Sequence, residues 1–180
     1  RSHDGVHWAN PMFLVGSSSN DSSQLQASWG FPVISAKGRM YVFYLKETGV
    51  IDVDRATTGA MGCLYSDDNG RTWTHGTDIP MPRNRFDHSD PNVPKSWIVW
   101  QLPIRDRLGR QIVGYTQWTS KQVAPPKPAG WYSQDSRCQF MRFENIDENP
   151  APEDLRIKWL PSDSRGLTVP YPDRPDVSVA

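Results

Sequence analysis

The stretch "SDDNGRTW", residues 66–73, decides how the rest of the chain is interpreted. Its Asn69-Gly70 pair favours a tight turn, because glycine adopts a positive φ without a steric cost. The hydroxyl and carboxylate groups before that pair can accept hydrogen bonds from the amides of the turn. Apolar residues that favour strands precede the stretch, and a Thr-Trp pair ends it. These features predict a β-hairpin whose polar turn is held by Asp68.

The spacing within this stretch resembles the Asp box, a repeat found in sialidases and related β-propellers. The residues that carry the resemblance are Ser66, Asp68, Gly70, Thr72 and Trp73. In that family the box is a structural turn between the third and fourth strands of a blade, and it takes no part in the chemistry. The chain opens with a shorter variant of the turn, formed by Ser2, Asp4, Gly5 and Trp8. The resemblance implies an all-β fold, a β-propeller of four-stranded antiparallel blades.

A Gly-Arg turn also occurs twice, independently of the boxes. Gly38 and Gly109 each lie in such a turn, with an apolar strand just upstream at 31–34 and at 97–102 and another just downstream. Each unit therefore reads as strand, turn, strand, long loop, strand, box-like turn and strand, which is an antiparallel meander. In the second unit the last turn, 144–156, is degenerate, because it lacks the glycine and carries two prolines.

We expect the chain to cover about two to three blades of a longer ring. The expected boundaries are 1–8 for the end of one blade, about 29–75 and about 96–160 for two further blades, and 161–180 for the lead-in to the next. The strand 40–45 is apolar on both alternating faces, as expected of a sheet packed between neighbours. So few blades cannot close a ring, so the remaining blades are expected from the same or another chain.

Composition excludes several kinds of partner. Equal numbers of basic and acidic residues, 20 of each, give zero formal net charge, which argues against nucleic-acid binding. No apolar run reaches membrane-spanning length. Cys63 and Cys138 begin matching strands of neighbouring units, and we expect separate reduced, buried thiols, with a disulfide as the alternative. The sequence has no zinc-binding pattern, and we expect neither a metal nor another cofactor.

The meander also predicts which end of the sheets carries function. The turns after the first and third strands share one end, and the loops after the second and fourth strands share the other. That second end holds long, irregular loops, at 9–28, 46–60, 75–96 and 119–137. Binding groups concentrate on such loops. In sialidase-like propellers the active site lies at this loop-rich end, over the central axis.

The loop segment 83–92 precedes an innermost strand and combines an imidazole with carboxylates and guanidiniums. Histidine and aspartate can move protons, and arginine binds a carboxylate through two parallel hydrogen bonds. The catalytic candidates are His88, Asp87 and Asp90. The substrate-binding candidates are Arg83, Arg85, Arg55, Trp131, Tyr132 and Arg137, of which Trp131 is the best placed to stack on a sugar ring. Asp52 and Asp54 are second-line candidates, whereas Arg105, Asp106 and Arg107 lie at the turn end. The structural alternative is a loop whose charges pair with each other.

The resemblance implies an exo-acting glycoside hydrolase of sialidase type that is secreted, periplasmic or on the cell surface. The motif that carries the first arginine of the sialidase triad, Phe/Tyr-Arg-Ile-Pro, is absent from the chain. Two alternatives therefore stay open. One is a propeller-type polysaccharide lyase acting on uronate-containing glycans, in which a histidine or tyrosine takes the proton beside the uronate carboxyl group. The other is a non-catalytic propeller that binds carbohydrate or protein.

Overall fold

The computed structural model describes residues 2–16, 26–50, 52, 59–124, 135–163, 165–171 and 174–179. These residues form antiparallel β-sheets and two short 3₁₀ helices, η2 (Ile146–Glu148) and η3 (Pro152–Asp154), with no α-helix among them. The expected all-β class is therefore confirmed. None of the described helices has the length and apolar character that crossing a bilayer requires.

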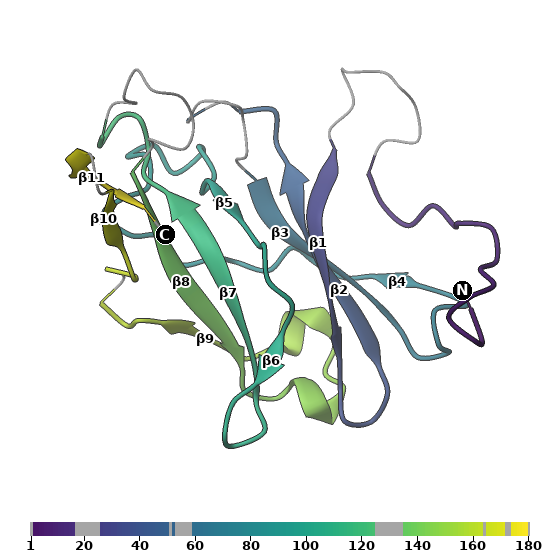
Figure 1. Ribbon diagram of the computed structural model, residues 1–180. Coiled ribbons are helices and arrows are strands. Elements are labelled where there is room, and N and C mark those ends of the chain that lie inside the picture. Colours follow the sequence, from purple (N-terminus) through teal and green to yellow (C-terminus); the bar gives the residue numbers. More distant parts are fainter. Residues whose placement is uncertain are drawn as a thin grey trace.

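The first sheet is a meander of four strands in chain order (Figure 1). The strands are β1 (Ala27–Ile34), β2 (Met40–Glu47), β3 (Gly59–Ser66) and β4 (Thr74–His75), each antiparallel to the next. The strand order expected from the first repeat is present, although β3 begins at Gly59, ahead of Cys63. A Cβ at Gly62 of β3 would be 2.3 Å from the Tyr44 ring, so a glycine is needed where β3 passes this side chain of β2.

The second sheet repeats the meander with a broken first strand. Its strands are β5 (Trp97–Ile98), β6 (Ile104–Arg105), β7 (Gln111–Trp118), β8 (Ser136–Phe143) and β9 (Ile157–Leu160). Both β5 and β6 pair with β7, which pairs with β8, and β8 pairs with β9. The single strand expected at 97–102 is thus two short segments, separated by a stretch in which Pro103 lacks a backbone N–H. Beyond it, β10 (Val169–Tyr171) and β11 (Arg174–Val179) form a separate two-stranded sheet.

Both Gly-Arg turns lie at the same end of their sheets (Figure 1). Gly38 and Gly109 have φ values of 89° and 80°, in the left-handed region that favours glycine. The carboxylate of Asp147 joins the two turns: it accepts the amide of Ala36 at 2.7 Å and pairs with Arg105 at 2.8 Å. The long loops therefore leave the opposite end of both sheets.

One face of each sheet packs against the other to form the core. Its fully buried side chains include Tyr41, Phe43 and Leu45 from the first sheet and Trp97, Val113, Tyr115, Met141 and Phe143 from the second. The ring centroids of Phe43 and Phe143 are 4.9 Å apart across the two sheets. On the outer face of the first sheet Leu64 is buried, whereas Ile34 is 53% exposed. Both faces carry apolar side chains, as expected, but the side chains of the shared face are more completely buried.

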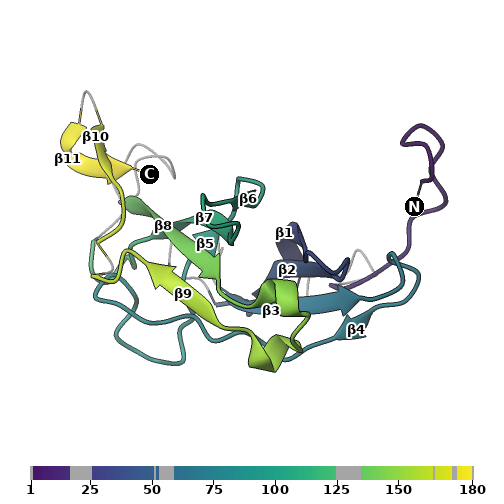
Figure 2. The ribbon, with the colours of Figure 1, turned by 90° about the horizontal axis from the view of Figure 1, so that it is seen from below.

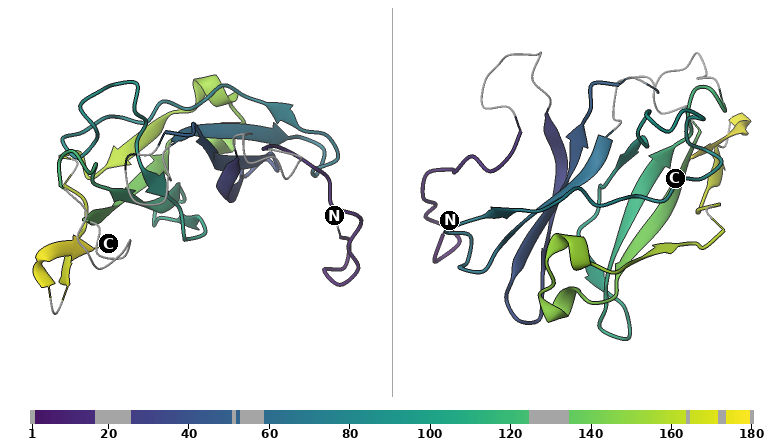
Figure 3. Two further views of the ribbon diagram at one scale, coloured as in Figure 1. Left: turned by 90° about the horizontal axis from the view of Figure 1, so that it is seen from above. Right: turned by 180° about the vertical axis from the view of Figure 1, so that it is seen from behind.

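The two sheets lie side by side in a curved arrangement (Figures 2 and 3). The first strands, β1 and β5–β6, lie on the concave side, and the last strands, β4 and β9, lie on the convex side. The N-terminal segment and the β10–β11 sheet lie at the two ends of this arc. In both meanders the strands therefore run in order from the concave side to the convex side.

The two box-like turns have the same hydrogen-bond pattern. Ser66 Oγ accepts the Gly70 amide at 2.8 Å, and Asp68 Oδ1 accepts the Thr72 amide at 2.8 Å. In the N-terminal turn Ser2 Oγ accepts the Gly5 amide, and Asp4 Oδ1 accepts the His7 amide, both at 2.8 Å. The indole N–H of Trp73 and of Trp8 each donates to the glycine carbonyl of its own turn at 3.2 Å. His7 takes the place of Thr72, since its ring also bonds the box aspartate. Both turns expected from the sequence are thus present.

Residues 144–156, which take the place of a third box, fasten the second sheet to the first. Arg39 donates to the carbonyls of Asn149 and Pro150 at 2.8 and 3.1 Å, and the Tyr41 hydroxyl donates to Pro150 at 2.7 Å. Ile146 is 1% exposed and completes the core from this segment. The degenerate turn therefore makes hydrogen bonds between the two sheets, whereas each box makes hydrogen bonds within its own turn.

The cysteines lie in different sheets as free thiols, as expected, although only Cys63 is buried. Cys63 faces the core, and its burial raises the pKa of the thiol to about 12. Cys138 lies on the other face of β8, and it is half-buried.

We predict that Asp68→Asn lowers the melting temperature at neutral pH. The amides of Arg71 and Thr72 and the Thr72 hydroxyl hold the pKa of Asp68 at about 2, below its ordinary 3.8. Because the folded-state pKa is depressed, the stabilisation is present above pH 4 and is lost as the pH falls through about 2. Thermal melts between pH 2 and pH 7 should show the two proteins converging in acid. Asp154→Asn, an exposed carboxylate, is the control, and an equal effect there would contradict the prediction.

We predict that Arg39→Ala lowers the free energy of unfolding by about 2 kcal/mol, because it removes hydrogen bonds to two partly buried carbonyls and the pair with Asp67. Chemical denaturation measures the change. Lys37→Ala, in the same turn and exposed, should change the free energy of unfolding by less than about 0.5 kcal/mol. A loss for Arg39→Ala no larger than that of the control would show that residues 144–156 contribute little to joining the sheets.

Candidate functional site

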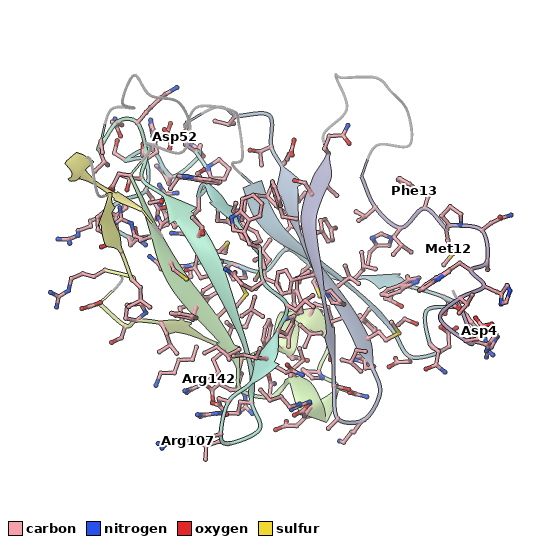
Figure 4. The ribbon with its side chains drawn as sticks, viewed as in Figure 1. Asp4, Met12, Phe13, Asp52, Arg107 and Arg142 are labelled. Carbon is pink, nitrogen blue, oxygen red and sulfur yellow. The ribbon has the colours of Figure 1, made fainter. Side chains whose placement is uncertain are left out.

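Three long loops meet at the end opposite the Gly-Arg turns. Ser120 bonds both neighbouring loops: its hydroxyl donates to Asp52 at 2.9 Å, and its amide donates to the Phe86 carbonyl at 2.8 Å. The Ser89 amide donates to Gln122 at 2.9 Å. Figure 4 shows Asp52 at this end and Arg107 at the other. The loop end expected from the meander is therefore a joined structure rather than a set of separate loops.

A buried ion pair lies beneath these loops. Lys95 Nζ lies 3.0 Å from both carboxylate oxygens of Asp87, and the two side chains are 4% and 2% exposed. Burial lowers the pKa of Lys95, and the charge of Asp87 opposes that change. Asp87 Oδ2 also accepts the Asn84 amide at 2.7 Å. The position and the partners of Asp87 suit a side chain that holds the loop in place.

The ion pair ends a chain of hydrogen bonds that runs along the shared face of the sheets. The Tyr115 hydroxyl donates to Gln139 at 2.6 Å, Gln139 Nε2 donates to Gln117 at 2.8 Å, and Gln117 Nε2 donates to Asp87 at 2.7 Å. Gln117 and Gln139 are 0% and 4% exposed. Because buried amides and carboxylates are costly without partners, this chain fixes the geometry of the loop end.

Two arginines stack on the ring of Phe86. The guanidinium carbon of Arg137 is 3.3 Å from the ring centroid, and that of Arg85 is 4.7 Å away. Arg137 is buried and bonds Thr119 and Asp135, although its Nε has no hydrogen-bond partner among the described residues. Arg85 is exposed. Positive charge thus gathers around Phe86, with one guanidinium inside the protein and one at the surface.

Arg83 has its guanidinium directed at its own loop. It donates to four backbone carbonyls, those of His88, Asp90, Pro91 and Val93. A planar fork with five donors is well suited to this task. Arg83 therefore shapes the 83–93 loop, and most of its hydrogen-bonding capacity is used there.

His88 and Asp90 are the catalytic candidates that reach the surface. His88 Nδ1 accepts the Asp90 amide at 3.0 Å, so the proton of a neutral His88 ring lies on Nε2. Asp90 is exposed, and its Oδ1 accepts the amide and the side chain of Asn92 at 2.9 and 3.0 Å. Asp90 Oδ2 accepts no hydrogen bond from the part of the chain that the structure describes. The loop therefore offers one N–H donor and one carboxylate oxygen to a ligand.

A cavity of about 450 Å³ lies beside the loop. Residues that line it include Met61, Ile79, Pro80, Met81, Arg83 and Lys95. Its walls are mainly apolar, and the Lys95 ammonium behind them is already paired with Asp87.

The structure divides the sequence candidates into two groups. Asp87, Arg83 and Arg137 belong to the scaffold of the loop end, whereas His88, Asp90 and Arg85 reach its surface. Asp52 is 3% exposed and bonds Ser120. Arg55, Asp54, Trp131 and Tyr132 lie outside the described residues. At the turn end Arg105 is exposed but pairs with Asp147, so it is not simply solvated.

Sequence reasoning missed Lys95, Phe86, Gln117 and Gln139. A signal for the glutamines was present, because they alternate with Tyr115 and Met141 on positions that face the core. A polar residue at a core position of an apolar strand marks a buried hydrogen-bond network. For Lys95 and Phe86 no pattern in the sequence indicated burial or stacking.

Neither a family model nor a curated protein matches this chain. Within the ranges described above, no group of three or more His, Cys, Asp or Glu side chains could hold a metal ion.

We predict that Lys95→Met lowers the free energy of unfolding by about 3–5 kcal/mol, because it leaves the Asp87 charge buried without its partner. Urea denaturation measures the loss. The double variant Asp87→Asn and Lys95→Met removes the charge but keeps an oxygen acceptor for Gln117, and should recover more than half of it. Equal losses in the single and double variants would show that the charge pair does not organise this site.

Proposed function

We propose that the chain forms a sector of an Asp-box β-propeller of the sialidase superfamily, with the remaining blades supplied by the same or another chain. Three observations support the proposal. Two meanders of the same strand order lie in an arc with their first strands inside. Two turns share the hydrogen-bond pattern of one motif. Both turn ends lie on the same side, so the long loops share the other.

Within that fold, we propose exo-acting glycoside hydrolysis at the loop end by a secreted, periplasmic or cell-surface protein. The observation that carries this proposal is the convergence of loops from both sheets on a rigid polar base, with His88, Asp90 and Arg85 at its surface. Loops held by a rigid scaffold are the usual site of binding and catalysis in such folds. The ligand is a glycan, the class that the fold resemblance indicates.

We infer different roles for the two aspartates of this loop. Asp90 is the accessible carboxylate, so it is the better candidate for general acid or base. Asp87 is neutralised by Lys95 and holds the loop beneath it. His88 presents an N–H, which suits a hydrogen bond to a sugar hydroxyl better than removal of a proton. For that reason hydrolysis has more support here than a lyase reaction that begins at His88.

A second candidate is glycan binding without hydrolysis, and the buried Asp87–Lys95 pair favours it. Glycosidases use two carboxyl groups that flank the scissile bond. Among the described residues of the 83–92 loop, Asp90 is the only exposed carboxylate, because Asp87 is buried. A partner carboxylate would have to come from elsewhere in the ring.

We predict that the protein releases the fluorophore from at least one exo-glycosidase substrate in a panel that includes sialic acid, galactose, glucose and fucose conjugates. Asp90→Asn should lower kcat about 10²–10⁴-fold. His88→Ala should lower kcat/KM about tenfold, because it removes the N–H that is proposed to bind a sugar hydroxyl. Arg85→Ala should raise KM, because an exposed cation beside the loop would bind substrate rather than react with it.

The matched control is Arg107→Ala, an exposed arginine at the opposite end, which should leave kcat and KM unchanged. Binding of glycans without turnover of any substrate would favour the second candidate. An ultraviolet-absorbing unsaturated uronate released from polysaccharide would establish a lyase. Unchanged turnover in both Asp90→Asn and His88→Ala would reject this choice of site.

A further inference from the structure

An aromatic pair on the concave side joins the two sheets. Trp29 of β1 and Trp100, which follows β5, have ring centroids 4.7 Å apart and planes inclined at 61°. Trp29 packs against the core, whereas Trp100 is 56% exposed. One indole is therefore anchored, and the other is more than half exposed to solvent.

The backbone at Trp29 is held in an uncommon conformation. Its φ is 53°, and the register between β1 and β2 shifts between Ser28 and Phe31, which is a β-bulge. A bulky residue with positive φ is an outlier, and bulges commonly redirect a side chain next to a functional site. Gly30, the next residue, could adopt a positive φ at no steric cost, yet it is Trp29 that has the positive φ. The bulge thus directs the Trp29 indole toward Trp100.

A carboxylate is bonded to the residue that precedes Trp29 in the chain. Ser28, the residue before Trp29, donates its hydroxyl to Glu47 Oε1 at 3.0 Å. Glu47 ends β2 and is half-buried, so the Ser28 bond holds its second oxygen in a defined position. The amide of Glu47 is also fixed, since it donates to the Gln26 carbonyl at 3.0 Å.

We propose that Trp29, Trp100 and Glu47 form a subsite for a neutral pyranose ring, which rests on the proposed glycan function. The C–H face of a pyranose stacks on an open indole, much as apolar groups pack on aromatic rings. A ring hydroxyl donates to Glu47 Oε2. Charge complementarity selects the occupant, because the Glu47 carboxylate accepts hydroxyls and repels a uronate or sialate ring.

The subsite lies where a glycan held at the loop end would extend. The bulge is near the start of β1 and Trp100 follows β5, and both of these strand regions lie toward the loop end on the concave side (Figures 1 and 2). The exposed apolar side chains further along the same strands, Leu102 and Ile104, lie nearer the Gly-Arg turns. The proposal is therefore restricted to the tryptophan pair.

The test is calorimetric titration of the protein with four neutral tetrasaccharides and one acidic one. The neutral probes are a β-linked glucose, an α-linked glucose, a mannose and a xylose tetrasaccharide, and the acidic probe is tetragalacturonate. At least one neutral probe should bind more tightly than the acidic one. Trp100→Ala should weaken that binding about tenfold or more. Glu47→Gln, which keeps the shape of the side chain, should reduce the preference for neutral over acidic probes. Trp8→Ala, a 71% exposed tryptophan in the N-terminal box, should change nothing.

No binding of any neutral probe, or equal binding by the protein and Trp100→Ala, would overturn the subsite. The subsite would also be overturned if Trp100→Ala changed only the molecular mass measured by light scattering, because the tryptophan pair would then be a contact between copies of the chain. Glycoside turnover with tetrasaccharide binding unaffected by Trp100→Ala would reject the subsite and leave the proposed hydrolysis intact. Binding that depends on Trp100 without turnover of any substrate would support the subsite and reject hydrolysis.

Discussion

The shared buried face between the two sheets is the constraint on which the rest of the structure depends. Contacts such as that between Phe43 and Phe143 restrict the position of the second meander relative to the first. Close packing of these buried side chains fixes how far apart the two sheets lie and how they are aligned. Once that is set, the positions of the turns at one end and of the loops at the other follow from strand direction alone.

The same interface changes character along its length. Near the Gly-Arg turns it is closed by Ile146 and by residues 144–156, and through the middle it is aromatic. Toward the loops the core-facing positions become polar, first Tyr115, then Gln139 and Gln117, and finally the Asp87–Lys95 pair. This order explains how the partly exposed His88 and the exposed Asp90 can be held in place: the polar end of the core is bonded directly to the loop that carries them.

Much of the architecture was predictable because it rests on local rules. Gly38 and Gly109 fixed the two turns, and the side chains of Asp68 and Asp4 satisfied amides only a few residues away. The site was less predictable, since its contacts join segments far apart in the chain. Asp87 in a loop of charged residues reads as a reactive group, and only the partners Lys95 and Gln117 show that it is buried. The strand break at Pro103 follows a local rule, whereas the stacking of Arg137 on Phe86 follows none.

The segment 144–156 has a consequence for modularity. Repeat proteins are usually regarded as strings of interchangeable units cut at sheet boundaries. Here the carbonyls that receive Arg39 and Tyr41 belong to the following meander, so the first unit carries donors whose acceptors come from its neighbour. A graft of either meander alone into another protein would leave those groups without their partners. The transferable building block is therefore the pair, and duplication or recombination that preserved function would have to move both together.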